Sequence, residues 1–433
     1  MTKQIAELHL HFQQCIQPKD LLAHLTKAKT IDWDWYEEEY LANYGVNSPA
    51  KQLVERYKNG DESAVEEFEK LCVFSDKDSG NFMRFLAKSN LFWAGCYRND
   101  DPNTNRRELL TIASRIRRSC IEQGITYAEF RQSGDAALLK MFDTNQHELV
   151  MRLAVSLDRA NPWDKWELVK EMALGEHGKS LTAIDFCNIE EGHPPKNMVS
   201  FFDTVKTFNK QNPDRALAIL YHVGENFKDK SLQSAIRWVQ EVAEMGAHRL
   251  GHAIALGVDP AMYGEHVRHE RVSERKDQIA YDLKHKAGLG EFGVTINENE
   301  LNIELLKLSQ LPDDYLVEIS YNASSLAEIR NRQGYAIECV RTTGAVIEVC
   351  PTSNLRIAGI TKEEYHPIHR FIAERLPIVI STDDPGIFGI TLEDEYSWVA
   401  QNVKGGKEIQ ETLLTTAYRS RSEVLSGREI VTF

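Results

Sequence analysis

Residues that can bind a metal ion or transfer a proton follow four short apolar runs of this sequence. The runs end in His9-Leu10-His11, His222-Val223-Gly224-Glu225, Gly251-His252 and Thr382-Asp383-Asp384. Taken singly, each motif is explained better by a core histidine or an acidic turn. Taken together, they place titratable groups at the ends of apolar segments, where an unpaired charge is costly to bury. A bound cation would remove that cost, so the set indicates a metal site.

The expected metal ligands are His9, His11, His222 and Asp383. Side chains two residues apart on a strand point to the same side, so His9 and His11 would converge. Imidazole and carboxylate ligands suit zinc and are acceptable to iron, manganese or cobalt. We therefore expect one zinc ion per chain, with an open position for a water molecule whose pKa the metal lowers. Glu225 follows a ligand by three residues and could donate a proton if burial keeps it protonated.

The elements that must position these residues are short β-rich runs separated by helical stretches. Such a pattern is typical of a parallel sheet with crossover helices. The runs cover residues 5–11, 125–131, 150–158, 181–186, 217–223, 247–253, 344–350 and 376–382. Eight of them predict an α/β fold of the (β/α)8 TIM-barrel type. The active sites of such barrels lie at the carboxyl ends of the strands, where the four motifs stand.

Two long segments interrupt the repeat, after the first and the sixth run. The first, about 20–115, has apolar residues at helical intervals and predicts a helical elaboration above the barrel mouth. The second, about 257–343, is rich in charge and then helical, and could be a lid, an oligomer contact or a solvated helical pair. The last two interpretations are favoured together over a lid. No linker divides the chain, so residues 1–433 are expected to form a single domain.

Composition narrows the range of partners and locations. A formal net charge of −14 disfavours nucleic acid as a partner, because phosphate binding needs a clustered basic surface. The sequence has no apolar run long enough for a membrane helix and no signal-peptide layout at its start, which predicts a cytoplasmic protein without membrane contact. The seven cysteines are scattered and never spaced as CxxC, so reduced thiols are expected.

The motifs HLH, HVGE, RLGH, EVCPTSN and STDDP, in this order and on these strands, resemble those of the adenosine deaminase family of the amidohydrolase superfamily. The segments YAEFR (127–131) and AIDF (183–186) and the pair His366-Pro367 are similar to further landmarks of the family. The resemblance covers residues 5–17 and about 120–400, except the second long segment.

The resemblance implies hydrolytic deamination of adenosine to a 6-oxo purine with release of ammonia. Zinc would be held by the four ligands named above. Glu225 would donate a proton to a ring nitrogen, and His252 would orient the attacking hydroxide and stabilise its charge. Asp384 would hydrogen-bond the purine and help to orient the water. Glu348 is either a carboxylate that fixes an imidazole ligand or a satisfied buried acid.

Two departures from the family pattern lie on the substrate side. Gln13 and Gln14 replace the expected aspartate and glycine after the first strand, and Gln13 can still hydrogen-bond a ribose hydroxyl. Asn188 replaces a glycine after the fourth strand; its backbone N–H can still reach the purine, and asparagine tolerates a positive φ. A purine nucleoside or base is therefore the expected small-molecule partner. Adenosine or deoxyadenosine comes first, and a 5′-modified nucleoside or free adenine second.

Rival functions remain open. A different amidohydrolase would usually carry a carboxylated lysine late in the barrel, and the eight strand-end motifs contain no lysine. The other rival is a barrel that has lost catalytic activity and only binds a purine or a protein. Such a barrel is possible because one fold can serve many functions. Such a barrel would be expected to have lost some of the ligands or Glu225, all of which are present. Association into a homo-oligomer is also compatible with the sequence.

Overall fold

The computed structural model describes residues 4–29, 31–95 and 102–430, and its centre is an eight-stranded parallel barrel. The strand order is β1-β2-β3-β4-β5-β6-β9-β10. The strands are β1 (Ala6–His11), β2 (Tyr127–Gln132), β3 (Val150–Ser156), β4 (Leu181–Phe186), β5 (Ala218–Val223), β6 (Arg249–His252), β9 (Val346–Val349) and β10 (Ile378–Ile380). Each lies within or overlaps one of the eight β-rich runs, so the predicted fold class is confirmed.

The barrel closes just beyond the end of β10. The backbone N–H of His11 donates to the carbonyl of Asp383 at 3.1 Å, and the N–H of Asp383 donates to the carbonyl of His9 at 3.0 Å. These two bonds join β1 to the loop after β10 in parallel register. Three expected metal ligands therefore lie at the seam where the first and last strands meet.

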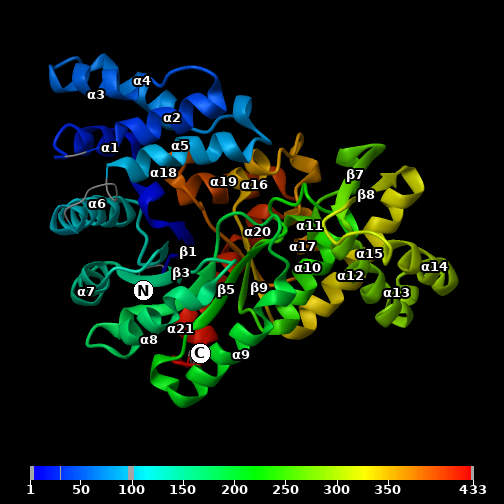
Figure 1. The fold of residues 1–433 in the computed structure, drawn as a ribbon. Helices are drawn as coiled ribbons and strands as arrows, with labels where there is room; N and C mark the ends of the chain where they lie inside the picture. The colour runs from blue at the N-terminus through cyan, green and yellow to red at the C-terminus, as the bar shows by residue number, and fades with distance from the viewer. Residues whose placement is uncertain (1–3, 30, 96–101, 431–433) are drawn as a thin grey trace.

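Helices surround the strands (Figure 1). Their apolar faces pack on the barrel and leave a continuous buried core. Those that follow or flank the strands are α7 (Ala136–Thr144), α8 (Trp166–Leu174), α9 (Val199–Gln211), α10 (Leu232–Met245), α11 (Ile254–Gly257), α15 (Ala323–Thr343), α16 (Pro351–Ile357), α17 (Ile368–Ala373), α18 (Pro385–Phe388), α19 (Leu392–Asn402), α20 (Gly406–Arg419) and α21 (Ser422–Leu425). Local signals set several ends: Ser231 caps α10, which stops at Gly246 with φ 100°, as expected for a left-handed C-terminal residue.

Helices α1 to α6 occupy the first long segment, between β1 and β2. They are α1 (Pro18–Leu25), α2 (Trp33–Tyr44), α3 (Ala50–Lys58), α4 (Ser63–Cys72), α5 (Phe82–Ala94) and α6 (Pro102–Glu122). Helices α1 to α5 form the blue group on one side of the molecule (Figure 1). The short turn η1 (Phe12–Cys15) contacts α5 and α18, which ties this group to the barrel mouth.

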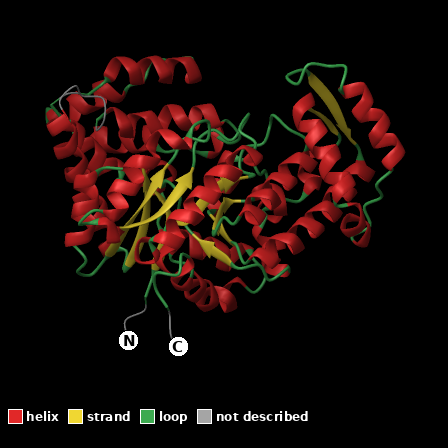
Figure 2. Cartoon of the chain, turned by 60° about the horizontal axis from the view of Figure 1, so that its bottom comes forward, coloured by secondary structure: helices red, strands yellow, loops and turns green. Residues whose placement is uncertain are grey.

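The second long segment contains a pair of strands that the sequence did not reveal. Strands β7 (His266–Arg271) and β8 (Leu316–Tyr321) pair antiparallel, and between them lie α12 (Val272–Lys284), α13 (Lys286–Glu291) and α14 (Glu298–Leu308). This part lies away from the barrel, on the side opposite α1 to α5 (Figure 2). The interpretation as a helical pair is incomplete because it lacks these two strands. More than forty residues separate them in the chain, so no hairpin turn marks the pair in the sequence. Its role as a lid, an oligomer contact or a solvated unit stays a prediction, as does the single-domain division.

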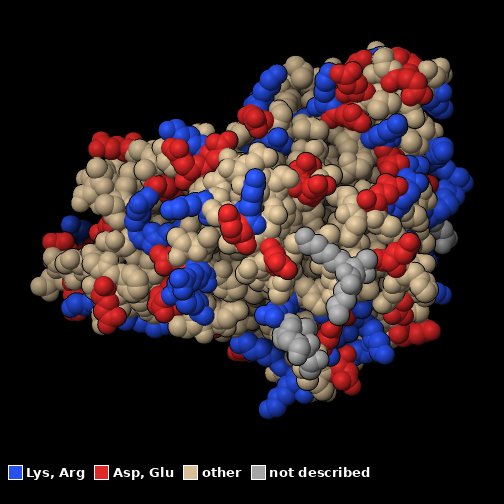
Figure 3. Space-filling view, turned by 180° about the vertical axis from the view of Figure 1, so that it is seen from behind, with Lys and Arg blue, Asp and Glu red and all other residues tan. Residues whose placement is uncertain are grey.

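Charged side chains lie over the surface (Figure 3), and the described cysteines form no disulfides. Acidic and basic side chains are interspersed over the face seen from behind (Figure 3). Among the described helices, none is long and apolar enough to cross a membrane. The six described cysteines are free, and the seventh, Cys96, lies outside the described residues.

Candidate metal and catalytic site

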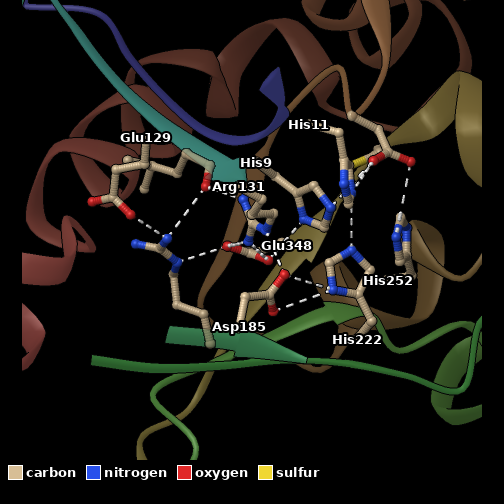
Figure 4. A network of polar contacts seen from close by, with 12 residues as sticks. His9, His11, Glu129, Arg131, Asp185, His222, His252 and Glu348 are labelled. Atoms are coloured by element: carbon tan, nitrogen blue, oxygen red, sulfur yellow. Dashed lines mark hydrogen bonds and ion pairs between the residues drawn. The ribbon is translucent and has the colours of Figure 1, made fainter. Parts of the chain in front are cut away.

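His9, His11, His222 and Asp383 converge at the carboxyl ends of the strands. Their ligand atoms all lie within 4.8 Å of one another. Nε2 of His11 is 3.2 Å from Nε2 of His222 and 3.1 Å from Oδ1 of Asp383. The same Oδ1 is 3.3 Å from Nε2 of His9. The structure therefore brings together all four residues predicted as ligands (Figure 4 labels the three histidines).

The donor set fits a divalent metal ion. Zinc bonds of ~2.0–2.1 Å place neighbouring nitrogen ligands roughly 3.3 Å apart in a tetrahedral site, which is close to the separations found here. Within the described part of the chain, Nε2 of His9 and Oδ1 of Asp383 are buried without a hydrogen-bond partner. Buried polar atoms are rarely left unpaired, so a cation between them would satisfy both.

The charges around the cluster also favour a cation. Burial and Arg131 oppose a positive charge on His9, but Glu348 and Asp383 outweigh them and raise the pKa of His9 to about 9. Burial opposes ionisation of Asp383, but contacts with His11 and His9 hold its pKa well below the usual range. An environment that stabilises positive charge on His9 and negative charge on Asp383 suits a metal ion that replaces the proton.

Glu225 lies beside this cluster on the loop after β5. Burial, together with the charges of Asp383 and Glu190, raises the pKa of Glu225 well above its usual value. The shift favours the protonated carboxyl, which is the form that a proton donor needs. Glu190 also accepts the backbone N–H groups of Gly224 and Glu225, both at 3.1 Å, and so fixes the loop.

His252 faces Glu225, with its Nε2 3.5 Å from Oε1 of the acid. Burial lowers the pKa of His252 well below 6.5, so the ring is neutral. The amide oxygen of Asn354 accepts the N–H of Cys350, and the Asn354 NH2 group therefore donates to Nδ1 of His252 at 2.9 Å. This arrangement places the ring proton on Nε2, on the side of Glu225.

Asp384 and Asn188 line the same cavity. Burial, with the charges of Asp383 and Glu225, raises the pKa of Asp384 well above its usual value. Asn188 has φ 79°, in the left-handed region that the sequence analysis considered for it. His252 and Asp383 also have positive φ, at 63° and 65°. Unusual backbone angles of this kind gather at functional sites, where the surrounding structure holds them.

The cavity has a volume of about 510 Å³ and extends from the ligand cluster to α5. Gln13 lines it, and within the described residues its buried Nε2 has no hydrogen-bond partner. The side-chain amide of Gln14, by contrast, already has a partner, because its Nε2 donates to the hydroxyl of Ser89 on α5 at 2.7 Å. Phe82, Leu86 and Trp93 of α5 add an apolar wall at the outer end.

Further polar side chains contact the candidate ligands, and the sequence analysis had considered this role only for Glu348. Glu348 accepts from Nδ1 of His9 at 2.8 Å, which settles its position beside a ligand imidazole. Asp185 lies 3.1 Å from Nδ1 of His222, and Ser353 donates to Asp383 at 2.7 Å. Asp185 and Ser353 stand inside the AIDF and EVCPTSN segments, but no local pattern distinguishes them from ordinary buried polar residues.

Cys350 remains outside the ligand set. It lies near His252 and Asp383. Burial raises the pKa of its thiol well above the usual value, so it is a neutral buried group.

Comparison with known proteins gives partial matches. A family model described as adenosine deaminase matches residues 335–420. Adenosine deaminase from Shewanella loihica is 40% identical over 231 residues, which are 53% of this chain and 44% of the relative. Aminodeoxyfutalosine deaminase from Acidothermus cellulolyticus is 36% identical over 84 residues, which are 18% of this chain and 24% of the relative. The chain thus spans less than half the length of these two curated relatives.

A solved structure extends the likeness over the whole fold. Adenine deaminase from Arthrobacter aurescens aligns over 98% of each chain with a TM-score of 0.55 at 15% identity. At that identity the likeness concerns the fold alone.

Proposed function

This chain belongs to the adenosine deaminase family, and we propose that it is a zinc-dependent hydrolase that deaminates adenosine or a related adenine nucleoside. The product would be the 6-oxo purine, and ammonia would be released. The observation that carries the proposal is the position of Glu225, whose pKa is raised, and of a neutral His252 beside four convergent candidate ligands, at one end of the 510 Å³ cavity.

His9, His11, His222 and Asp383 would hold the ion. When bound there, a divalent metal lowers the pKa of a water molecule towards neutrality and so makes a nucleophile available. The remaining steps belong to the side chains around it.

Glu225 would donate its proton to a ring nitrogen of the purine and make the amino-bearing carbon more electrophilic. His252, with its proton on Nε2, would orient the nucleophile and stabilise the charge that develops on the oxygen. Addition of the oxygen gives a tetrahedral carbon. Transfer of a proton to the amino group then allows the C–N bond to break, so that one water is consumed and one ammonia leaves.

Asp384 and Asn188 would orient the base. Asp384 has the raised pKa of a carboxyl that can donate as well as accept a hydrogen bond, and it lies beside the ligand Asp383. Asn188 would offer its backbone N–H to the purine. Gln13, whose Nε2 is unpaired, is the candidate contact for the sugar.

The outer part of the cavity favours a nucleoside as the substrate. Among the described lining residues the basic side chains are Arg131 and Lys165. The Arg131 guanidinium already contacts Asp185, Glu348 and a backbone carbonyl, and Nζ of Lys165 lies 3.4 Å from the carbonyl oxygen of Ser133. The lining therefore offers a phosphate one lysine and no free arginine fork among the described residues.

A second candidate substrate is an adenine nucleoside with an apolar 5′ group. The wall formed by Phe82, Leu86 and Trp93 favours it, as does the replacement of the expected acid by Gln13. Free adenine would leave this part of the cavity empty. The cytoplasmic location and the homo-oligomer stay predictions from the sequence.

The first experiment is to follow the ultraviolet absorbance of adenosine with zinc-loaded protein. The amino purine should convert to the oxo purine, and removal of the metal by a chelator should abolish the conversion, with recovery on adding zinc. Stoichiometric zinc without conversion of adenosine, 5′-modified adenosines or adenine would contradict the proposal and support a purine-binding barrel that has lost catalytic activity.

A further inference from the structure

Two arginines lie inside the barrel among carboxylates, beneath the ligand cluster. The side chains of Arg131 on β2 and Arg249 on β6 are buried, as are those of Glu129, Asp185 and Glu348. Figure 4 shows Arg131 at the centre of this network, between Glu348 and Asp185. Isolated buried charges are strongly unfavourable, so the arrangement of the pairs matters.

Arg131 contacts two carboxylates at once. Its Nε donates to Asp185 at 3.0 Å, and its Nη2 donates to Glu348 at 2.6 and 2.8 Å. Its Nη1 donates to the carbonyl of Leu8, the residue before the ligand His9, at 2.7 Å. The planar fork of a guanidinium can make these contacts together, whereas a single ammonium group cannot.

Each of these carboxylates holds a different histidine of the ligand cluster. Glu348 is 2.8 Å from Nδ1 of His9, and Asp185 is 3.1 Å from Nδ1 of His222. A neutral imidazole carries one proton, and an acceptor at Nδ1 keeps the proton there. The lone pair of Nε2 then points to the cluster in both rings.

Arg249 supports the network from the other side. Its Nε donates to Glu348 at 2.7 Å, and its Nη2 pairs with Glu129. Among the described arginines, Arg131 is therefore the one that bridges Asp185 and Glu348, the two carboxylates that contact the histidines.

We propose that Arg131 is a positioning residue that couples two metal ligands, because it fixes the carboxylates that orient both His9 and His222. Without its guanidinium, Asp185 loses its charged partner and Glu348 keeps Arg249 alone. The carboxylates that contact the two imidazoles are then no longer joined by one guanidinium. The rings can turn, and their Nε2 atoms no longer keep the geometry that a metal needs. This inference rests on the metal site of the proposed function.

The test is metal affinity, measured by competition with a chromophoric chelator and without any substrate. Arg131→Met keeps much of the side-chain volume but removes the fork, and should weaken zinc binding ~10–100-fold, the usual effect of losing an outer partner of a ligand. Arg131→Lys can reach one carboxylate at a time and should restore part of the affinity.

A matched control is Arg237→Met. Arg237 is also buried, but it pairs with Glu274, Glu241 and Gln278 on the outer helices. This variant should lower the unfolding temperature and leave the zinc affinity of the folded protein unchanged. A merely structural role for Arg131 would give the same pattern.

The outcomes separate the two proposals. Wild-type affinity in a folded Arg131→Met protein would overturn the inference. If that variant fails to fold, Arg131→Lys decides, because wild-type affinity there would show that the bridging fork is not needed. A wild-type protein that binds no zinc would overturn the proposed function as well, whereas wild-type binding with unaffected variants would overturn this inference alone.

Discussion

At the scale of single residues, the site combines a protonated acid with a neutral imidazole. Both states have the same cause, since burial disfavours the charged form of Glu225 and of His252. The opposite holds for the neighbouring Asp383, whose contacts with histidines keep it ionised. The surroundings therefore favour the neutral forms of Glu225 and His252 and the charged form of the adjacent Asp383.

Glu225→Gln should abolish turnover while zinc remains bound. The amide cannot donate the carboxyl proton, and the ligands are other residues, so we expect a loss of ~10²–10⁴-fold in kcat. Steady-state rates and zinc content of the same preparation check this. Because only protonated Glu225 is active, wild-type activity should also fall as the pH rises through its elevated pKa. Retained activity in the variant would remove Glu225 from the mechanism.

Asn188 holds a backbone conformation that few residues adopt. Asn188→Gly keeps the positive φ available and removes a side chain from the cavity wall, so the protein should stay folded and the KM for adenosine should fall. Asn188→Val meets the same φ with a β-branched side chain and should cost ~1–3 kcal/mol of stability. Denaturant unfolding of both variants measures the difference. Equal stability of the two would show that the local conformation is not held by this site.

At the scale of elements, two short helical turns shape the cavity mouth. The turn η1 carries Gln13 and Gln14, and α18 follows the ligand Asp383. They pack so closely that a Cβ on Gly386 would lie 2.2 Å from the carbonyl oxygen of Ile16 and 2.6 Å from that of Gln14. The first helix after β10 thereby positions the turn after β1.

Gly386→Ala should push η1 away from α18. We expect lower thermal stability and a raised KM, with zinc still bound, because the displaced residues line the cavity and are not ligands. Calorimetry and steady-state kinetics test this. Gly290→Ala is the control, since a Cβ there has no heavy atom within 4 Å and should leave both quantities unchanged. A Gly386→Ala protein with wild-type KM would mean that η1 does not set substrate binding.

At the scale of the whole molecule, the end of the chain closes the barrel floor. The backbone N–H and hydroxyl of Ser422 donate to Glu129 at 2.7 and 2.6 Å, and Arg249 donates to the carbonyl of Ser420 at 2.6 Å. The buried charges of the barrel are thus completed by the segment around α21.

Removal of residues 420–433 should therefore destabilise the entire protein. Glu129 would lose both Ser422 contacts and Arg249 its contact with Ser420, and breaking a buried charged network of this kind costs ~3–5 kcal/mol. Urea unfolding measures the loss. Ile430→Ser is the control, because that side chain is 85% exposed and should contribute little. Stability equal to that of the full chain would show that α21 is dispensable for the floor.

The sequence by itself determined the barrel strands and indicated the four candidate ligands. Both have local signals: an apolar run bounded by polar residues predicts a buried parallel strand, and the HxH spacing places His9 and His11 on one side of β1. His222 and Asp383 were indicated by their positions at the ends of other predicted strands. Asn188 also has a local signal, because its residue type already favours the positive φ that it adopts.

Only the tertiary structure decided which residues hold those ligands in place. The contact of Glu348 with His9 spans 339 positions, and that of Arg131 with Glu348 spans 217. The pairing of β7 with β8 and the closure between His9 and Asp383 depend equally on distant segments. A buried arginine or carboxylate has no local period or spacing, because its partners are set by the folded chain. The sequence therefore left two interpretations of Glu348 open and gave no signal for the contacts of Arg131 or for the pairing of β7 with β8.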